Sequence, residues 1–128
     1  MTAAWFSLWW PAFLSTLLTE VPIDALFLER RLGLADALAL GVALQCITHP
    51  LFWSAWGLAP AFFYDHYGAA VLGFEAVVYL VEAALIWLAL PRRNASQRLP
   101  NPVLALLTSA FANTASVLIG LLSSVSSS

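Results

Sequence analysis

Four long apolar segments constrain this chain more than any other feature of its sequence. They cover approximately residues 4–28, 34–58, 69–90 and 102–123. Each is long enough to cross a bilayer, since a helical span needs about 20 apolar residues. The chain is 62% hydrophobic and only 9% charged, whereas soluble domains carry about 25% charged residues. We therefore predict an all-α integral membrane protein: a four-transmembrane-helix bundle that forms a single transmembrane domain over residues 1–128.

The connecting segments predict how this bundle is oriented. All five basic residues are arginines, and they lie in the connections after the first and third spans, at 30–31 and 92–98. Arginine-rich connections are retained on the cytoplasmic side of a membrane. Both termini are then expected on the non-cytoplasmic side. The expected location is a bacterial-type inner (plasma) membrane, which the chain crosses several times.

Two segments of the chain resemble each other. EVPIDALFLERR (Glu20–Arg31) and EAALIWLALPRR (Glu82–Arg93) align without gaps, and each runs from a glutamate to an Arg-Arg pair. The similarity is either coincidence in a leucine-rich chain or the trace of an internal repeat. A repeat would give two parallel helical hairpins related by an axis along the membrane normal, an arrangement found in some transporters.

Polar side chains lie near the middle of the predicted spans. A rise of 1.5 Å per residue from the cytoplasmic ends places Glu20 and Glu82 at the same depth, about 12 Å. A charged side chain near mid-bilayer costs about 2.5–3.5 kcal/mol, so these groups should face the bundle interior. Burial disfavours the ionised form, and at least one carboxyl group is expected to be protonated or compensated at neutral pH. The predicted binding site comprises Glu20, His49, Glu75, Glu82 and Asn113, supported by Gln45, Thr48, Tyr79 and Ser116.

The segment LTEVPID (Leu18–Asp24) places a proline between two acids. Pro22 has no N–H and so frees the carbonyl group of Leu18. Freed backbone at membrane depth persists only where protein or a cavity satisfies it. We therefore predict a kink at this point, with Glu20 facing inward. Asp24 is expected nearer the cytoplasmic surface, paired with one of the arginines that follow, Arg30 or Arg31.

Three functions fit these residues. The first is proton- or cation-linked transport of a small solute, because ionisable groups inside a membrane are functional by default. The second is an accessory or structural subunit of a larger membrane complex, whose polar residues hold helices together or dock a partner. The third is an intramembrane enzyme in which Glu20, Glu82 and His49 perform acid–base catalysis. Since no nucleophile motif accompanies them, the sequence favours a protein that is not an enzyme.

The sequence also bears on partners and cofactors. No basic arm or stripe is present to bind nucleic acid, and the lipid bilayer is the expected surrounding. One four-helix bundle leaves little room for a pore, so we expect a homo-oligomer or partner membrane subunits. No cofactor is expected. His49 and Glu75 at one depth are compatible with a metal, but zinc takes three or four such ligands, and the alternative is a hydrogen-bonded or proton-relaying histidine.

Overall fold

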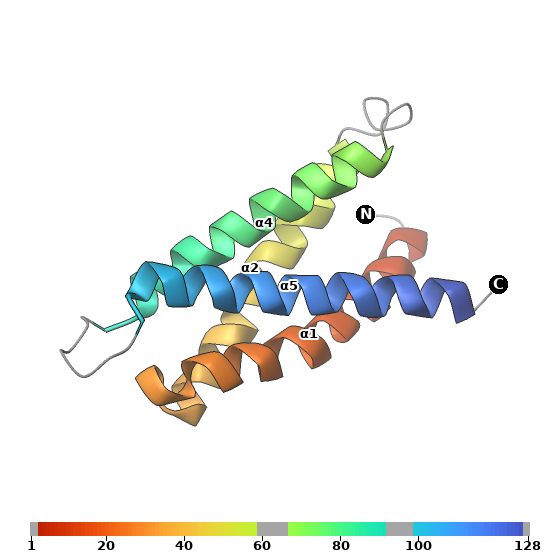
Figure 1. The fold of residues 1–128 in the computed structure, drawn as a ribbon. Helices are drawn as coiled ribbons and strands as arrows, with labels where there is room; N and C mark the ends of the chain where they lie inside the picture. Colours follow the sequence, from red (N-terminus) through yellow and green to blue (C-terminus); the bar gives the residue numbers. More distant parts are fainter. Residues whose placement is uncertain (1–2, 59–66, 92–98, 127–128) are drawn as a thin grey trace.

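The described part of the chain is entirely helical apart from its connections. The computed structural model describes residues 3–58, 67–91 and 99–126, which form α1 (Ala3–Leu32), α2 (Leu34–Leu58), α4 (Tyr67–Ala89) and α5 (Asn101–Ser126) (Figure 1). No strand occurs within these ranges, and each helix is long and apolar enough to cross a membrane. The predicted all-α class and its four helices are confirmed. The three arginines of residues 92–98 lie outside the described residues.

A single glycine joins α1 to α2. Gly33 has a φ of 85°, a left-handed conformation that glycine adopts without a Cβ clash. Its N–H donates to the Glu29 carbonyl at 2.7 Å, and its own carbonyl accepts from the N–H of Ala37 at 3.0 Å. This arrangement caps the end of α1 in the way common for a glycine just after a helix. It reverses the chain within one residue, so α1 and α2 form a tight hairpin.

The four helices are arranged so that each packs against two others. α1 packs against α2 and α5, and α4 packs against α5 and α2. α1 and α4 therefore lie diagonally across the bundle. Figure 1 shows that α4 and α5 meet where the chain passes from one to the other and diverge toward their opposite ends. The bundle is thus closed at the end that holds Gly33 and Asn101 and more open at the other.

The interior of the bundle is layered. Near the Gly33 end, eight buried apolar side chains from the four helices and from Leu90, just after α4, form a core that we call the apolar plug: Ala25, Leu28, Ala37, Leu44, Ile86, Leu90, Leu104 and Ala105. Toward the other end follows a layer of buried polar side chains, the polar layer: Glu20, Asp24, Gln45, Thr48, Glu82, Thr108, Ser109 and Asn113. Apolar packing therefore closes one end, and polar groups occupy the middle.

The expectation that protein or a cavity surrounds the backbone freed by Pro22 is wrong, because Pro22 and Leu18 lie on the outer face of α1. α1 is helical throughout Ala3–Leu32 and includes Pro22. Leu18 and Leu26, one turn to either side of Pro22, are 78% and 72% exposed, and Pro22 is exposed with them. Glu20 is only 3% exposed. Two residues of an α-helix turn by about 200°, so Glu20 and Pro22 point to opposite faces, and the proline face is the outer one.

The contact between α1 and α2 depends on small residues. A Cβ added to Gly41 would lie 3.2 Å from Asp24 Oδ2 and 3.3 Å from Val21 Cα. Ala37, one turn earlier on α2, is completely buried. Glycine and alanine on one face let two helix backbones approach closely. The α1–α2 hairpin is therefore tight at least as far as Gly41 and not only at its turn.

The predicted pairing of Asp24 with Arg30 or Arg31 is also wrong. Asp24 is 2% exposed and lies against Gly41 of α2. Arg31 instead donates to the Leu99 carbonyl at 2.6 Å and to Asn101 Oδ1 at 3.3 Å. The physical reason is the helix face. Asp24 follows Glu20 by one turn and so points inward with it, whereas Arg31 reaches outward to the start of α5.

Candidate functional site

Glu82 of α4 is the centre of a hydrogen-bond network in the polar layer. Its Oε1 accepts from Thr48 Oγ1 at 2.9 Å and from Gln45 Nε2 at 3.3 Å, both on α2. Its Oε2 accepts from Asn113 Nδ2 at 2.6 Å and from Ser109 Oγ at 3.4 Å, both on α5. Glu82 is only 2% exposed. Donors from two neighbouring helices thus surround this carboxyl group and offset the cost of burying it.

Gln45 connects Glu82 to a second buried carboxyl group. Its Nε2 donates to Glu20 Oε2 at 2.6 Å as well as to Glu82 Oε1 at 3.3 Å. A side-chain amide nitrogen carries two hydrogens, so one residue of α2 can serve both acids. Glu20 and Glu82 belong to the diagonal helices α1 and α4. The structure therefore brings together, through Gln45, the two acids that the sequence placed at the same depth.

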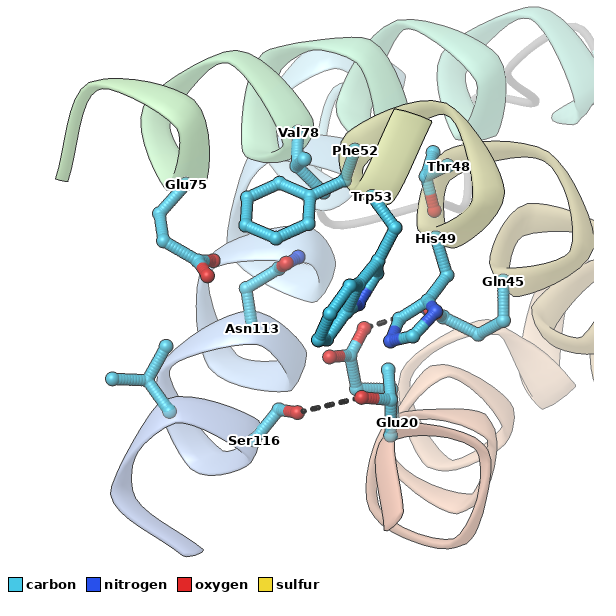
Figure 2. Close-up of a pocket in the computed structure, with 12 residues that line it drawn as sticks. Glu20, Gln45, Thr48, His49, Phe52, Trp53, Glu75, Val78, Asn113 and Ser116 are labelled. Atoms are coloured by element: carbon cyan, nitrogen blue, oxygen red, sulfur yellow. Dashed lines mark hydrogen bonds between the residues drawn. The ribbon is translucent and has the colours of Figure 1, made fainter. Parts of the chain in front are cut away.

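A cavity of about 180 Å³ lies beside the polar layer, on the side away from the apolar plug (Figure 2). Two acids line it, Glu20 and Glu75, and among its described lining residues there is no arginine. Figure 2 shows side chains from all four helices converging on this space. The other lining residues are two amides, three hydroxyls, a histidine and four apolar or aromatic side chains: Gln45, Asn113, Thr16, Thr48, Ser116, His49, Phe52, Trp53, Val78 and Val117.

The two amides present acceptors to this cavity. Gln45 and Asn113 both bind glutamate oxygens through their nitrogen atoms. Within the described ranges, no hydrogen bond reaches the carbonyl oxygen of either side chain, and both residues line the cavity. Carboxyl and amide oxygens together give the cavity several acceptors beside its three hydroxyl groups. Such a lining is complementary to a proton or another cation.

His49 sits in a cluster of aromatic rings at the edge of the cavity. The ring centroids of Phe13, Trp9 and Trp53 lie 5.2, 6.0 and 6.1 Å from the imidazole centroid. Its Nδ1 is buried and has no hydrogen-bond partner in the described part of the chain. In that same part, no three His, Cys, Asp or Glu side chains come close enough to hold a metal ion. The geometry therefore does not join His49 and Glu75 in a metal centre.

Glu75 and Tyr79 lie on the side of the site where α4 and α5 diverge. A second hollow of about 420 Å³, the α4–α5 groove, is lined there by Leu72, Glu75, Ala76, Tyr79, Ala110, Asn113, Thr114, Val117 and Leu118. Glu75, Asn113 and Val117 line both the groove and the cavity. Tyr79 lines only the groove, while its backbone carbonyl accepts from Ser109 Oγ at 2.9 Å. Tyr79 thus lies outside the cavity that the other predicted residues share or border.

Among the residues of the site that were not predicted from the sequence are Thr16, Asp24 and Ser109. Thr16 lines the cavity and accepts from Ser116 Oγ at 3.4 Å. Asp24 and Ser109 are buried in the polar layer at 2% and 0% exposure. Each of the three lies four residues from Glu20 or Asn113. Residues four apart share a helix face, so this spacing was the signal that would have found them.

The site must be interpreted from its own chemistry. Comparison with protein-family models, curated proteins and solved structures gives no match for this chain. Its buried acids are held by uncharged donors rather than by arginine. A carboxyl group in such surroundings needs a proton or a cation to offset its burial. The arrangement therefore favours reversible binding of a proton or cation.

Proposed function

We propose that this chain is a multi-pass membrane protein that binds a proton or a small cation in its cavity and uses that exchange to transport a small solute. The observation that carries the proposal is the position of Glu20. It lines the cavity, and its described hydrogen bond is to Gln45. A buried carboxylate without a fixed positive partner is costly, and either a proton or a bound cation removes that cost. Alternation between the two at Glu20 is the proposed coupling step.

The proposed orientation gives the cavity a direction. Arg30 and Arg31 end α1 on the same side as the apolar plug. Arginine-rich connections favour the cytoplasmic side, which we propose for a bacterial-type inner membrane. Both termini then lie on the non-cytoplasmic side, toward which α4 and α5 diverge. The described arrangement would be an outward-facing state, with the plug as its closed inner gate.

The proposed internal repeat fits the same picture. Glu20 and Glu82 occupy equivalent positions in α1 and α4, and each binds the helix that follows it: Glu20 binds Gln45 of α2, and Glu82 binds Asn113 of α5. Two parallel hairpins of this kind can rock against each other about a site at their interface. Because the apolar plug fills the interior of the described helices at one end, we also propose that the working unit is a homo-oligomer.

The test is proton flux in reconstituted liposomes. Purified protein is placed in vesicles that contain a pH-sensitive dye, and a pH gradient is imposed with and without an opposing sodium or potassium gradient. We expect dye signals that depend on the protein, that Glu20→Gln abolishes, and that Glu29→Gln leaves unchanged. Glu29 is the matched control because it is an exposed glutamate of the same helix.

Two outcomes would contradict this proposal. Flux that persists in Glu20→Gln would remove the carboxyl group from the coupling step. Absence of flux in the unmodified protein, with a second membrane protein retained during purification in mild detergent, would favour the accessory-subunit interpretation instead.

A further inference from the structure

The cavity borders the α4–α5 groove. The cavity and the α4–α5 groove share Glu75, Asn113 and Val117. The outer rim of the groove is exposed, with Leu72 at 72% and Leu118 at 54%. An exposed apolar surface, the Glu75 carboxyl group and the polar cavity therefore adjoin one another between α4 and α5.

The two hollows have different chemistry. Apart from Glu75, Tyr79, Asn113 and Thr114, the groove is lined by leucine, alanine and valine. The cavity is lined by acceptors and by the rings of Phe52 and Trp53, and aromatic faces attract cations. An engineered cavity of about 150 Å³ takes up benzene, so a cavity of about 180 Å³ has room for a small organic group rather than for a bare ion alone.

We propose, building on the proposed function, that the cation is an amphipathic organic ammonium that reaches the site sideways from the membrane. Its ammonium group lies in the cavity between Glu20 and Glu75, and its apolar part lies in the α4–α5 groove. Charge complementarity selects this occupant. A lipid acyl chain or an apolar helix of a second copy would bury the Glu75 carboxyl group against hydrocarbon with no compensating charge.

Equilibrium binding in nanodiscs tests the ligand class. The probe is hexyltrimethylammonium, followed by tryptophan fluorescence because Trp53 lines the cavity, with empty nanodiscs subtracted. We expect saturable binding that Glu75→Gln weakens by about tenfold, the effect of losing one partly desolvated charge contact. Tetramethylammonium, which has only the head group, should bind through the same acids. Hexyl sulfate and hexanol, which share the chain but lack the positive charge, should not bind.

A variant that fills the groove tests the route. Ala76 lines the groove but not the cavity, so Ala76→Phe should weaken binding of hexyltrimethylammonium by about tenfold and leave tetramethylammonium binding unchanged. Ala84→Phe is the matched control, because Ala84 is an exposed alanine of the same helix outside both hollows. Equal behaviour of the two variants would overturn the lateral route.

Other occupants of the groove would be recognised directly. Hexanol competing as well as the ammonium would show that the groove binds an acyl chain only. Disulfide-linked dimers formed by Ala76→Cys in a Cys46→Ser background would show that a second copy covers it. Either result overturns the inference. Binding is measured without a gradient, so it does not depend on transport. Ammonium binding without proton flux would reject the proposed transport but not the ligand. Proton flux without ammonium binding would reject the ligand but not the transport.

Discussion

The apolar plug and the polar layer are built from the same four helices but are held together by different interactions. In the plug, Leu28, Ala37 and Ile86 are completely buried and contribute only apolar contacts. In the polar layer, Glu82 joins α4 to α2 and α5 through four hydrogen bonds. Close packing of apolar side chains stabilises the plug. Packing in the plug therefore closes one end of the bundle, whereas the hydrogen bonds of the polar layer determine which helix faces meet.

The largest expected effect is the loss of the Glu82 acceptor. Glu82→Leu removes four hydrogen bonds at once, and at about 1 kcal/mol for each bond we expect the free energy of unfolding to fall by about 3–5 kcal/mol. Equilibrium unfolding in mixtures of dodecyl sulfate and dodecyl maltoside measures it. The matched variant is Glu20→Leu, which loses one described hydrogen bond and should cost about 1 kcal/mol. Equal costs for the two variants would break the distinction between a structural acid and a cavity acid.

Truncation in the plug should come next in size. Leu28 is completely buried, and Leu28→Ala is expected to lower the free energy of unfolding by about 2–4 kcal/mol because it leaves a cavity. Cation binding at the other end should keep its affinity. Leu26→Ala is the control, since Leu26 is 72% exposed and should change stability by less than about 0.5 kcal/mol. A loss of cation affinity in Leu28→Ala would show that the two regions are not separable.

The tight α1–α2 contact predicts opposite signs for two glycine substitutions. Gly41→Ala places a Cβ 3.3 Å from Val21 Cα. Because a backbone atom cannot move away as a flexible side chain can, we expect the free energy of unfolding to fall by about 1–2 kcal/mol. Gly73→Ala meets nothing within 4 Å and should stabilise α4 by up to about 1 kcal/mol through helix propensity. Thermal unfolding of both variants measures the difference. A stabilising Gly41→Ala would mean that the hairpin is looser than described.

The smallest expected effect concerns the connection at the closed end. Asn101 Nδ2 donates to the Pro91 carbonyl at 2.8 Å, and its Oδ1 accepts from Arg31 at 3.3 Å. Asn101→Ala removes both contacts near the surface and should cost about 0.5–1 kcal/mol. The same unfolding assay applies, with Asn101→Asp as the variant that keeps the acceptor for Arg31. If Asn101→Ala lowered the free energy of unfolding more than Leu28→Ala does, the Asn101 contacts rather than the plug would close the bundle.

The sequence predicted the helices well because length and hydropathy alone determine them. The second span was predicted at 34–58 and is observed at Leu34–Leu58. The relative position of Glu20 and Glu82 along their helices was also predictable, since the rise along a helix is constant. The two side chains are joined by one glutamine, Gln45.

Which face of each helix points inward was harder to predict. In lipid the outer face is as apolar as the core, so hydropathy carries little signal about orientation. The backbone freed by Pro22 was therefore expected against protein or a cavity although Pro22 and Leu18 are exposed, and Asp24 was placed near the surface although it is buried. The α4–α5 groove was not foreseen, because the divergence of two helices depends on packing along their whole length rather than on any local motif.

Carbodiimide labelling of the membrane-embedded protein, located by mass spectrometry, tests the central claim most directly. Apolar carbodiimides modify protonated carboxyl groups that they can reach. Glu20 lines the cavity, while both oxygens of Glu82 are engaged by α2 and α5. We predict modification of Glu20, reduced by hexyltrimethylammonium or by a small cation, and none of Glu82. Modification of Glu82 with Glu20 untouched would contradict the account.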